Sequence, residues 1–433
     1  MIVLLMLGVL FILLFATTPI AVCLGLSCSS VFWTFYPGTT VDAMLSQATV
    51  SSIDSFSLLA IPFFMLVGTL MEKGGIAKKL VDIADMLTGN MPGGLGMAAV
   101  VASMFFAAIS GSGPATAAAI GGIMLGAMQL QGYSRGYSGA VIAAGSTIGP
   151  VIPPSIPMIM YGVTIGVSVS YMFIGGIIPG ILMGVVLMIY NYFVSRKRGY
   201  KAARRDHTMT ARDKRTILKN GIPAILMPVI ILGGIYSGVF TPTESAVIGA
   251  VYAIVVSVFV YRSLSWKDFK QALFEAAITS ATIMILFGAA NTFGRLLTMN
   301  NVPARVTDAM LSLTDSKLVI MLLVNLALLI IGMFMDTISS ILLFAPIFAP
   351  LVTSLGYDPL LFGIIMVINL CIGMITPPMG GNLFVAQRIA GATFEEIFKE
   401  ALPMIIILYL LLVVLILFPD ITLCLPKLMK YAG

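Results

Sequence analysis

One carboxylate stands inside a long apolar stretch of this chain. Asp336 lies in the sequence Gly332-Met-Phe-Met-Asp-Thr-Ile-Ser-Ser. A carboxylate at membrane depth is costly, and where one occurs it usually faces a cavity and serves an ion or a substrate. Asp336 could support Na⁺ binding, contact substrate hydroxyls or accept a proton. The alternative is that it only caps the helix that follows.

Two apolar segments are interrupted by the same Gly-x-x-x-Pro-Pro sequence. The first interruption covers residues 149–154 and the second covers residues 373–378, which is 224 positions later. Proline lacks an N–H group and clashes with the preceding helical turn, so carbonyls beside each break lose their helical partners. Paired breaks at membrane depth are typical of the ion and substrate sites of secondary transporters.

Polar residues beside these breaks complete the candidate sites. Hydroxyl, amide and unwound carbonyl oxygens suit Na⁺, which is a hard cation, and half-helix N-termini attract anions. A structural turn alone could explain the Gly-Ser-Gly-Pro sequence at 111–114. We predict that the substrate-binding residues are Ser110, Ser112, Ser155, Asp336 and Asn382. Of two predicted Na⁺ sites, site 1 comprises Ser110, Ser112, Gly145, Ile148, Pro150 and Val151, and site 2 comprises Gly332, Asp336, Gly373 and Thr376.

The composition requires a membrane protein around these residues. Of the 433 residues, 59% are hydrophobic and only 10% are charged, which excludes an ordinary soluble domain. We therefore predict an all-α polytopic membrane protein. Its expected spans are 2–18, 20–36, 54–72, 134–166, 171–194, 219–238, 243–262, 271–298, 360–391 and 402–420. Segments 93–130 and 317–354 are apolar but broken by polar residues, glycine and proline, which favours re-entrant hairpins.

The chain reads as two homologous halves. Hairpin 93–130 falls on hairpin 317–354 at the offset of 224, and the broken helix 134–166 falls near 360–391. Each half then holds about five spans and one hairpin. Because an odd number of crossings inverts the second half, we predict an inverted repeat of residues 1–194 and 219–433.

A basic loop separates the halves and sets the orientation. Residues 195–218 carry much of the net charge of +6. A short Lys/Arg-rich loop between spans marks the cytoplasmic side, so we expect no nucleic-acid partner. Both termini would lie on the opposite side. Lysines and arginines expected on the cytoplasmic side are Lys73, Lys78, Lys79, Arg135, Arg262, Lys267 and Lys270, whereas Lys427 and Lys430 are exceptions.

Other motifs have structural interpretations or are missing. Thr241-Pro-Thr-Glu244 predicts a capping box, and Arg295 and Arg388 are expected to reach the interface from span ends. Amphipathic segments at 75–87 and 302–311 predict helices along the interface or ordinary connecting helices. The sequence holds no P-loop motif and no His-Glu-x-x-His or Gly-x-Ser-x-Gly motif, so we expect neither ATP hydrolysis nor an enzyme.

Five segments together resemble a known family. The chain is similar along its whole length to the DctM-type large membrane subunit of TRAP (tripartite ATP-independent periplasmic) transporters. The segments that carry the resemblance are Ile61-Pro-Phe-Phe-Met-Leu-Val-Gly, Ile148-Gly-Pro-Val-Ile-Pro-Pro-Ser, Phe240-Thr-Pro-Thr-Glu-Ser-Ala, Gly332-Met-Phe-Met-Asp and Thr376-Pro-Pro-Met-Gly.

The resemblance implies an elevator-type importer of the bacterial inner membrane, driven by two or more Na⁺ ions. The solute would be an organic acid such as sialic acid, a sugar acid or a C4-dicarboxylate. The implied partners are a separate small four-helix membrane subunit, a periplasmic substrate-binding protein and membrane lipid. In sialic-acid members, the positions of Ser110, Ser155 and Asp336 are implicated in substrate binding. Residues 113–116 depart from that subgroup, which argues against sialic acid.

Three alternatives compete with this prediction. A stand-alone Na⁺/dicarboxylate symporter would transport without a binding protein. A channel would show flux far above carrier turnover that does not saturate. A membrane scaffold would tolerate the loss of Asp336 and of both Pro-Pro breaks.

Overall fold

The computed structural model of the chain describes residues 1–35, 41–200 and 210–431. Over these residues the chain forms helices and contains no β-strand. Nine of the described helices are long and apolar enough to cross a membrane. The prediction of an all-α polytopic membrane protein is therefore confirmed.

The first half contains one helical hairpin and one broken helix. The hairpin comprises α6 (Gly94–Ser110) and α7 (Gly113–Leu130), and the broken helix comprises α8 (Arg135–Ser146) and α9 (Ile156–Ile165). The other α-helices of this half are α1 (Ile2–Phe15), α2 (Ile20–Phe35), α3 (Val41–Ile53), α4 (Ala60–Lys73), α5 (Ile76–Thr88) and α10 (Val169–Arg198), with the short helix η1 (Phe56–Leu59) before α4.

The second half repeats this order. Its hairpin comprises α15 (Lys317–Phe334) and α16 (Thr337–Ser354), and its broken helix comprises α17 (Pro359–Gly373) and α18 (Gly381–Ala390). The other helices are α11 (Ala211–Tyr236), α12 (Pro242–Val255) with its extension η2 (Val256–Val260), α13 (Trp266–Met299), α14 (Val302–Leu313), α19 (Phe394–Leu417) and α20 (Pro419–Leu428). Helices α7 and α16 both start and end 224 positions apart, so the helix ends repeat at the offset seen in the sequence.

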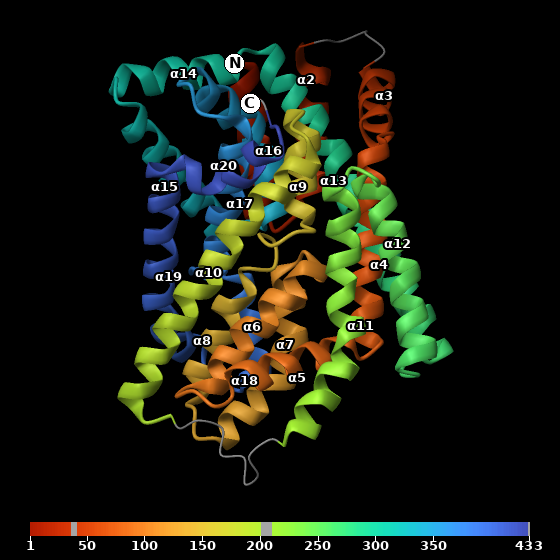
Figure 1. The fold of residues 1–433 in the computed structure, drawn as a ribbon. Helices are drawn as coiled ribbons and strands as arrows, with labels where there is room; N and C mark the ends of the chain where they lie inside the picture. The colour runs from red at the N-terminus through yellow and green to blue at the C-terminus, as the bar shows by residue number, and fades with distance from the viewer. Residues whose placement is uncertain (36–40, 201–209, 432–433) are drawn as a thin grey trace.

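The two hairpins approach each other from opposite ends of the molecule. Helices α6 and α7 lie at the end where α10 finishes and α11 begins, whereas α16 lies at the end that holds both chain termini (Figure 1). Helix α5 lies at the first of these ends and α14 at the second. The two hairpin tips are thereby brought to the middle of the molecule.

The halves are interlocked through their broken helices. Helix α18 of the second half packs against α7 and α8 of the first half. Helix α9 of the first half packs against α16 of the second half. Each hairpin therefore contacts the second segment of the other half's broken helix, which is α18 for the first hairpin and α9 for the second.

The structure corrects several predicted boundaries. Helices α10 and α11 extend into the predicted loop 195–218, and residues 201–209 of that loop lie outside the described part of the chain. Helix α3 was not predicted, because its sequence is too polar to resemble a span; it packs against α13. The predicted span 402–420 is also wrong at both ends. Helix α19 begins earlier, at a Thr393 cap, and Pro419 starts a separate helix because proline is well placed in a first helical turn.

Candidate functional site

The first hairpin tip lies directly against the first break. Gly111, between α6 and α7, has a φ of +58°, and a Cβ built there would lie 2.8 Å from the Pro154 carbonyl oxygen. A Cβ at Gly149 would lie 2.9 Å from both the Ser112 carbonyl oxygen and the Thr116 Oγ1 atom. Glycine is therefore required at both positions for the tip and the break to approach this closely.

An oxygen cluster forms at this contact. The Ser110 and Thr116 hydroxyl oxygens are 3.0 Å apart, and the Thr116 hydroxyl donates to the Ser112 carbonyl at 2.7 Å. The Ser112 side chain caps α7 by accepting from the Ala115 N–H at 3.5 Å. The cluster contains Thr116, which the sequence analysis did not single out.

Ser155 has a different position from the tip serines. It is fully buried as the N-cap of α9, where its hydroxyl accepts from the Met158 N–H at 3.2 Å and donates to the Pro150 carbonyl. The Gly145 carbonyl accepts the Ile148 N–H at 3.3 Å, whereas the Ile148 carbonyl accepts two N–H groups, from Val151 at 2.9 Å and from Ile152 at 3.0 Å. A carbonyl oxygen has two lone pairs, so the Gly145 carbonyl keeps capacity for a cation, whereas both lone pairs of the Ile148 carbonyl are used.

The second hairpin and the second break touch through their backbones. A Cβ at Gly373 would lie 2.6–2.7 Å from backbone atoms of Gly332. Helices α15 and α17 are therefore in direct backbone contact at these two glycines. The Met379 N–H also donates to the Met333 carbonyl at 3.1 Å. The Thr376 hydroxyl donates to the Ile372 carbonyl at 2.8 Å, inside its own break.

Asp336 caps a helix and also lines a cavity. It is the N-cap of α16, where its carboxylate accepts from the Ser339 N–H at 3.0 Å and from the Ser339 hydroxyl. It is also exposed and lines a cavity. Among the described residues no lysine or arginine forms an ion pair with it. Its charge is therefore balanced only by hydrogen bonds and remains available to a cation or a hydroxyl group.

Asn382 is the most unusual polar residue of the site. Its side chain is fully buried in α18, and both its Oδ1 and Nδ2 atoms have no hydrogen-bond partner in the structure. A Cβ added to Gly113 of the first hairpin would lie 3.0 Å from either atom. Because an unpaired buried amide costs about 1–3 kcal/mol, this arrangement suits a bound ligand.

A cavity of about 180 Å³ joins the two tips. The first half contributes the tip and the break, and the second half contributes Asp336 and its neighbours. The opposite wall comes from α4 and α13. The lining residues are Met65, Gly111, Ser112, Gly113, Pro114, Pro150, Ile156, Pro157, Thr279, Ile283, Asp336, Thr337, Ile338 and Met374.

Only some of the predicted site residues meet in this cavity. Ser112, Pro150 and Asp336 line it. The other predicted residues do not line it and lie in α6, α8, α15, α17 and α18 or in the two breaks: they are Ser110, Gly145, Ile148, Val151, Ser155, Gly332, Gly373, Thr376 and Asn382. Sequence reasoning missed Met65, Thr279 and Ile283, because nothing in an apolar or hydroxyl side chain on an unbroken helix distinguishes it from an ordinary span residue.

Sequence reasoning also missed a buried asparagine pair. Asn369 of α17 donates to the Asn325 carbonyl at 2.7 Å and to its side-chain oxygen at 2.8 Å. The available signal was one amide in each of two otherwise apolar helices. The pair joins the second hairpin to the second broken helix, away from the cavity.

The donor set suits an alkali cation better than a transition metal. In the described part of the chain, no three His, Cys, Asp or Glu residues cluster in a way that could hold a metal ion. The tips instead offer hydroxyl and carbonyl oxygens, one carboxylate and one unpaired amide. Such oxygen-rich sites favour hard cations.

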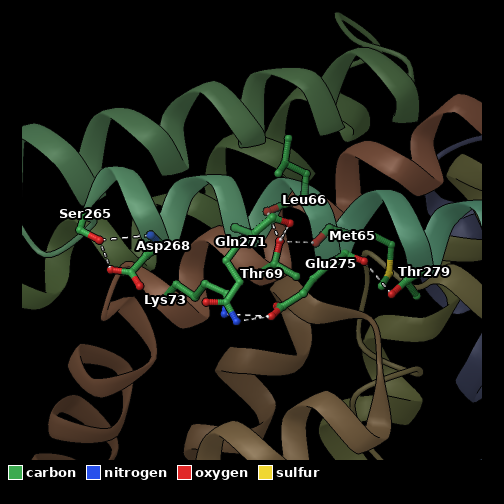
Figure 2. A network of polar contacts seen from close by, with 10 residues as sticks. Met65, Leu66, Thr69, Lys73, Ser265, Asp268, Gln271, Glu275 and Thr279 are labelled. Atoms are coloured by element: carbon green, nitrogen blue, oxygen red, sulfur yellow. Dashed lines mark hydrogen bonds and ion pairs between the residues drawn. The ribbon is translucent and has the colours of Figure 1, made fainter.

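A polar network on α4 and α13 borders the wall of the cavity (Figure 2). Lys73 forms an ion pair with Glu275 at 3.1 Å, and Gln271 donates to the same carboxylate oxygen at 2.9 Å. Thr69 donates to the Ala272 carbonyl at 3.3 Å, which joins the two helices directly. These contacts join α4 to α13 beside Thr279, so the wall of the cavity is formed by two packed helices.

The predicted capping box at α12 is confirmed. The Thr241 hydroxyl accepts from the Glu244 N–H at 3.2 Å, and the Glu244 carboxylate accepts from the Thr241 N–H at 2.8 Å. Neither residue lines the central cavity.

The profile of one family matches nearly the whole chain. That family is described as "Tripartite ATP-independent periplasmic transporter, DctM component", and the match covers residues 7–421. The chain belongs to this family. The resemblance predicted from the five motifs is therefore confirmed, and the chain is a large permease component of the TRAP type.

Relatives from several bacteria are similar to this TRAP component. An isethionate TRAP transporter permease protein of Oleidesulfovibrio alaskensis is 42% identical over 93% of this chain and 63% of its own length. A C4-dicarboxylate TRAP transporter large permease protein of Pseudomonas aeruginosa is 39% identical over 93% of both chains. A sialic acid TRAP transporter large permease protein of Vibrio cholerae is 36% identical over 88% of this chain and 89% of its own. These relatives are transport permeases rather than enzymes.

A solved structure shares the fold. The YdaH transporter of Alcanivorax borkumensis superposes with a TM-score of 0.66 at 15% identity, covering 88% of this chain and 89% of that one. At that identity the likeness concerns the architecture alone.

Proposed function

We propose that this chain is the transporting subunit of an Na⁺-coupled importer for an acidic organic solute in the bacterial inner membrane. The observation that carries the proposal is the cavity with two hairpin tips on one side and α4 and α13 on the other. A site between two such bodies is what alternating access requires, because sliding one body along the other exposes the site to either side. The family membership supports the same conclusion.

The tips would hold the ions and part of the substrate. Ser110, Ser112 and Thr116 offer three neighbouring oxygens on the first tip, and Asp336 offers a carboxylate on the second. These are the residues that would complete two Na⁺ sites, with the carbonyls of the adjacent breaks. The N-termini of α7, α9 and α16 lie around the cavity. The dipoles of these helices favour an anionic group there.

The solute would carry a carboxylate or another acidic group. Relatives are named for isethionate, C4-dicarboxylates, sialic acid and 2,3-diketo-L-gulonate, all of them acids. We further propose that a small membrane subunit and a periplasmic binding protein work with this chain, as the family's tripartite name suggests. An elevator motion would then move the hairpins and broken helices against α4 and α13.

Uptake into proteoliposomes tests this function. The chain, its small subunit and its binding protein would be reconstituted and offered the four named acids, with an inward Na⁺ gradient or with K⁺ in its place. Saturable uptake that requires Na⁺ and the binding protein is the expected result. Uptake without a binding protein would favour a stand-alone symporter, non-saturating flux a channel, and no uptake of any acid a non-transporting scaffold.

A further inference from the structure

A second cavity lies beyond the central one. It has a volume of about 200 Å³ and lies between α9, α13 and α16. Its lining combines apolar residues with an arginine, an asparagine and two threonines. The lining residues are Thr164, Phe287, Ala290, Asn291, Gly294, Arg295, Thr298, Leu342 and Pro346.

The lining of this cavity carries a positive charge on an exposed side chain. Arg295 is the only charged residue in the lining. Within the described part of the chain it forms no ion pair or hydrogen bond through its side chain, and neither does Asn291. The Thr164 and Thr298 hydroxyls each donate to a carbonyl of their own helix, at 2.7 and 3.0 Å. They can still accept a hydrogen bond, but they contribute no negative charge.

The same three helices, α9, α13 and α16, contribute to the lining of both cavities. On α13, Thr279 and Ile283 line the central cavity, and Phe287, about one turn beyond Ile283, begins the lining of the second cavity, which extends to Thr298. Helix α16 behaves likewise, since Ile338 lines the central cavity and Leu342 and Pro346 line the outer one. The rise of a helix places Arg295 about 18 Å beyond Ile283.

The second cavity lies toward the end of the molecule that holds the chain termini. Helix α13 ends at Met299, next to α14, and α14 lies at that end (Figure 1). The basic ends of α10 and α11 lie at the opposite end. If those ends are cytoplasmic, as their charges indicate, the Arg295 cavity opens on the periplasmic side.

We propose that Arg295, with Asn291 and Thr298, forms an outer anion site that receives the acidic group of the solute before it reaches the central cavity. This proposal rests on the proposed import function. A planar guanidinium with five donors matches a carboxylate or sulfonate, and a neighbouring amide adds a further donor. Arg295 thus differs from the earlier expectation, in which it only reached the interface.

The first test needs no knowledge of the solute. Thr298→Cys, in a chain whose exposed Cys424 is replaced by serine, would be labelled with an anionic sulfonatoethyl methanethiosulfonate and with its cationic trimethylammonium counterpart. A local positive charge should favour the anionic reagent, and Arg295→Gln should lower the anionic-to-cationic rate ratio by about tenfold. Arg305→Gln is the matched control, because Arg305 is exposed on α14 at the same end and lies outside the cavity. An unchanged ratio in Arg295→Gln would overturn the anion site.

The second test links the site to transport. For whichever of the four named acids the reconstituted complex takes up, Arg295→Gln should raise KM by at least about tenfold, with maximal rate changed by less than about twofold. Arg295→Lys should recover part of the loss, since it keeps the charge but not the planar fork. An unchanged KM beside a lowered labelling ratio would overturn the role in solute capture. Failure of the wild-type complex to take up any acid would refute the import function instead, and the labelling result would still decide whether the cavity attracts anions.

Discussion

Asp336 holds a helix end and faces a cavity with the same carboxylate. As an N-cap it satisfies the Ser339 N–H, and as a lining residue it presents a negative charge between two helical bodies. These two roles respond differently to asparagine, because asparagine caps a helix as well as aspartate does but carries no charge. The substitution therefore separates structure from function at one position.

We expect Asp336→Asn to keep the stability of the wild-type complex and to lower Na⁺-dependent uptake by roughly 10- to 100-fold, the loss typical of one charged hydrogen-bond partner. Uptake and melting temperature would be measured on the same preparation. Asp358→Asn is the matched control, since Asp358 caps α17 and lies outside the cavity. Normal uptake by Asp336→Asn would leave Asp336 with a capping role alone.

At Asn382, a substitution is expected to maintain stability without Na⁺ while weakening the effect of Na⁺. Replacing its unpaired buried amide by leucine should leave the melting temperature without Na⁺ unchanged or raised, because a desolvation cost disappears. The same change should reduce the rise in melting temperature that Na⁺ produces, if the amide serves the bound state. The measurement is a thermal titration with Na⁺ against K⁺ at constant ionic strength. A clear loss of stability without Na⁺ would show instead that the amide supports the fold.

Substitution of Thr241 should affect stability and not transport. Thr241→Ala removes the cap of α12 and should cost about 1 kcal/mol of stability. Uptake per folded molecule should stay at the wild-type level, because the residue lies outside both cavities. Loss of uptake at normal expression and melting temperature would contradict the structural role given to this motif.

At the scale of elements, the close contact of tip and break depends on glycine. Gly111→Ala would force an L-residue into left-handed backbone and place a methyl group 2.8 Å from the Pro154 carbonyl oxygen. We expect a loss of about 2 kcal/mol or more, and a weaker Na⁺-induced rise in melting temperature. Gly122→Ala in α7 is the matched control, since its added methyl group meets no atom within 4 Å. A neutral Gly111→Ala would contradict the packing of tip against break.

The elements differed in how well the sequence predicted them. Hairpin 93–130 corresponds closely to α6 and α7, because Gly111 and Pro114 mark a turn that apolar helices cannot pass through. Helix α3 escaped prediction, because its mixture of polar and apolar residues has no strong helical face. The wall residues Met65 and Thr279 escaped as well, since their role depends on which helices pack together. Spacing within one half likewise cannot show that Asn382 of the second half lies against Gly113 of the first.

At the scale of the whole molecule, alternating access requires relative motion of two bodies. The cavity separates Ile338 of the second hairpin from Ile283 of α13, so these positions report on that motion. We expect Ile283→Cys combined with Ile338→Cys, joined by a short bifunctional thiol reagent in a Cys424→Ser chain, to abolish uptake. Either substitution alone, treated with the same reagent, is the control. Full uptake in the cross-linked molecule would exclude motion of this hairpin against α13.

The interlocking of the halves has a consequence for energy conservation. Asn382 of α18 lies against the first tip, and α9 packs against the second hairpin, so neither tip is anchored only to its own half. These shared contacts give a route by which a ligand at one tip can act on the other, and by linkage any such effect on affinity is mutual. In the proposed Na⁺-coupled importer, a carrier with independent tips would cross the membrane half-loaded and dissipate the ion gradient. In that importer, the contacts between the two halves would help to keep the ratio of ions to solute constant in every transport cycle.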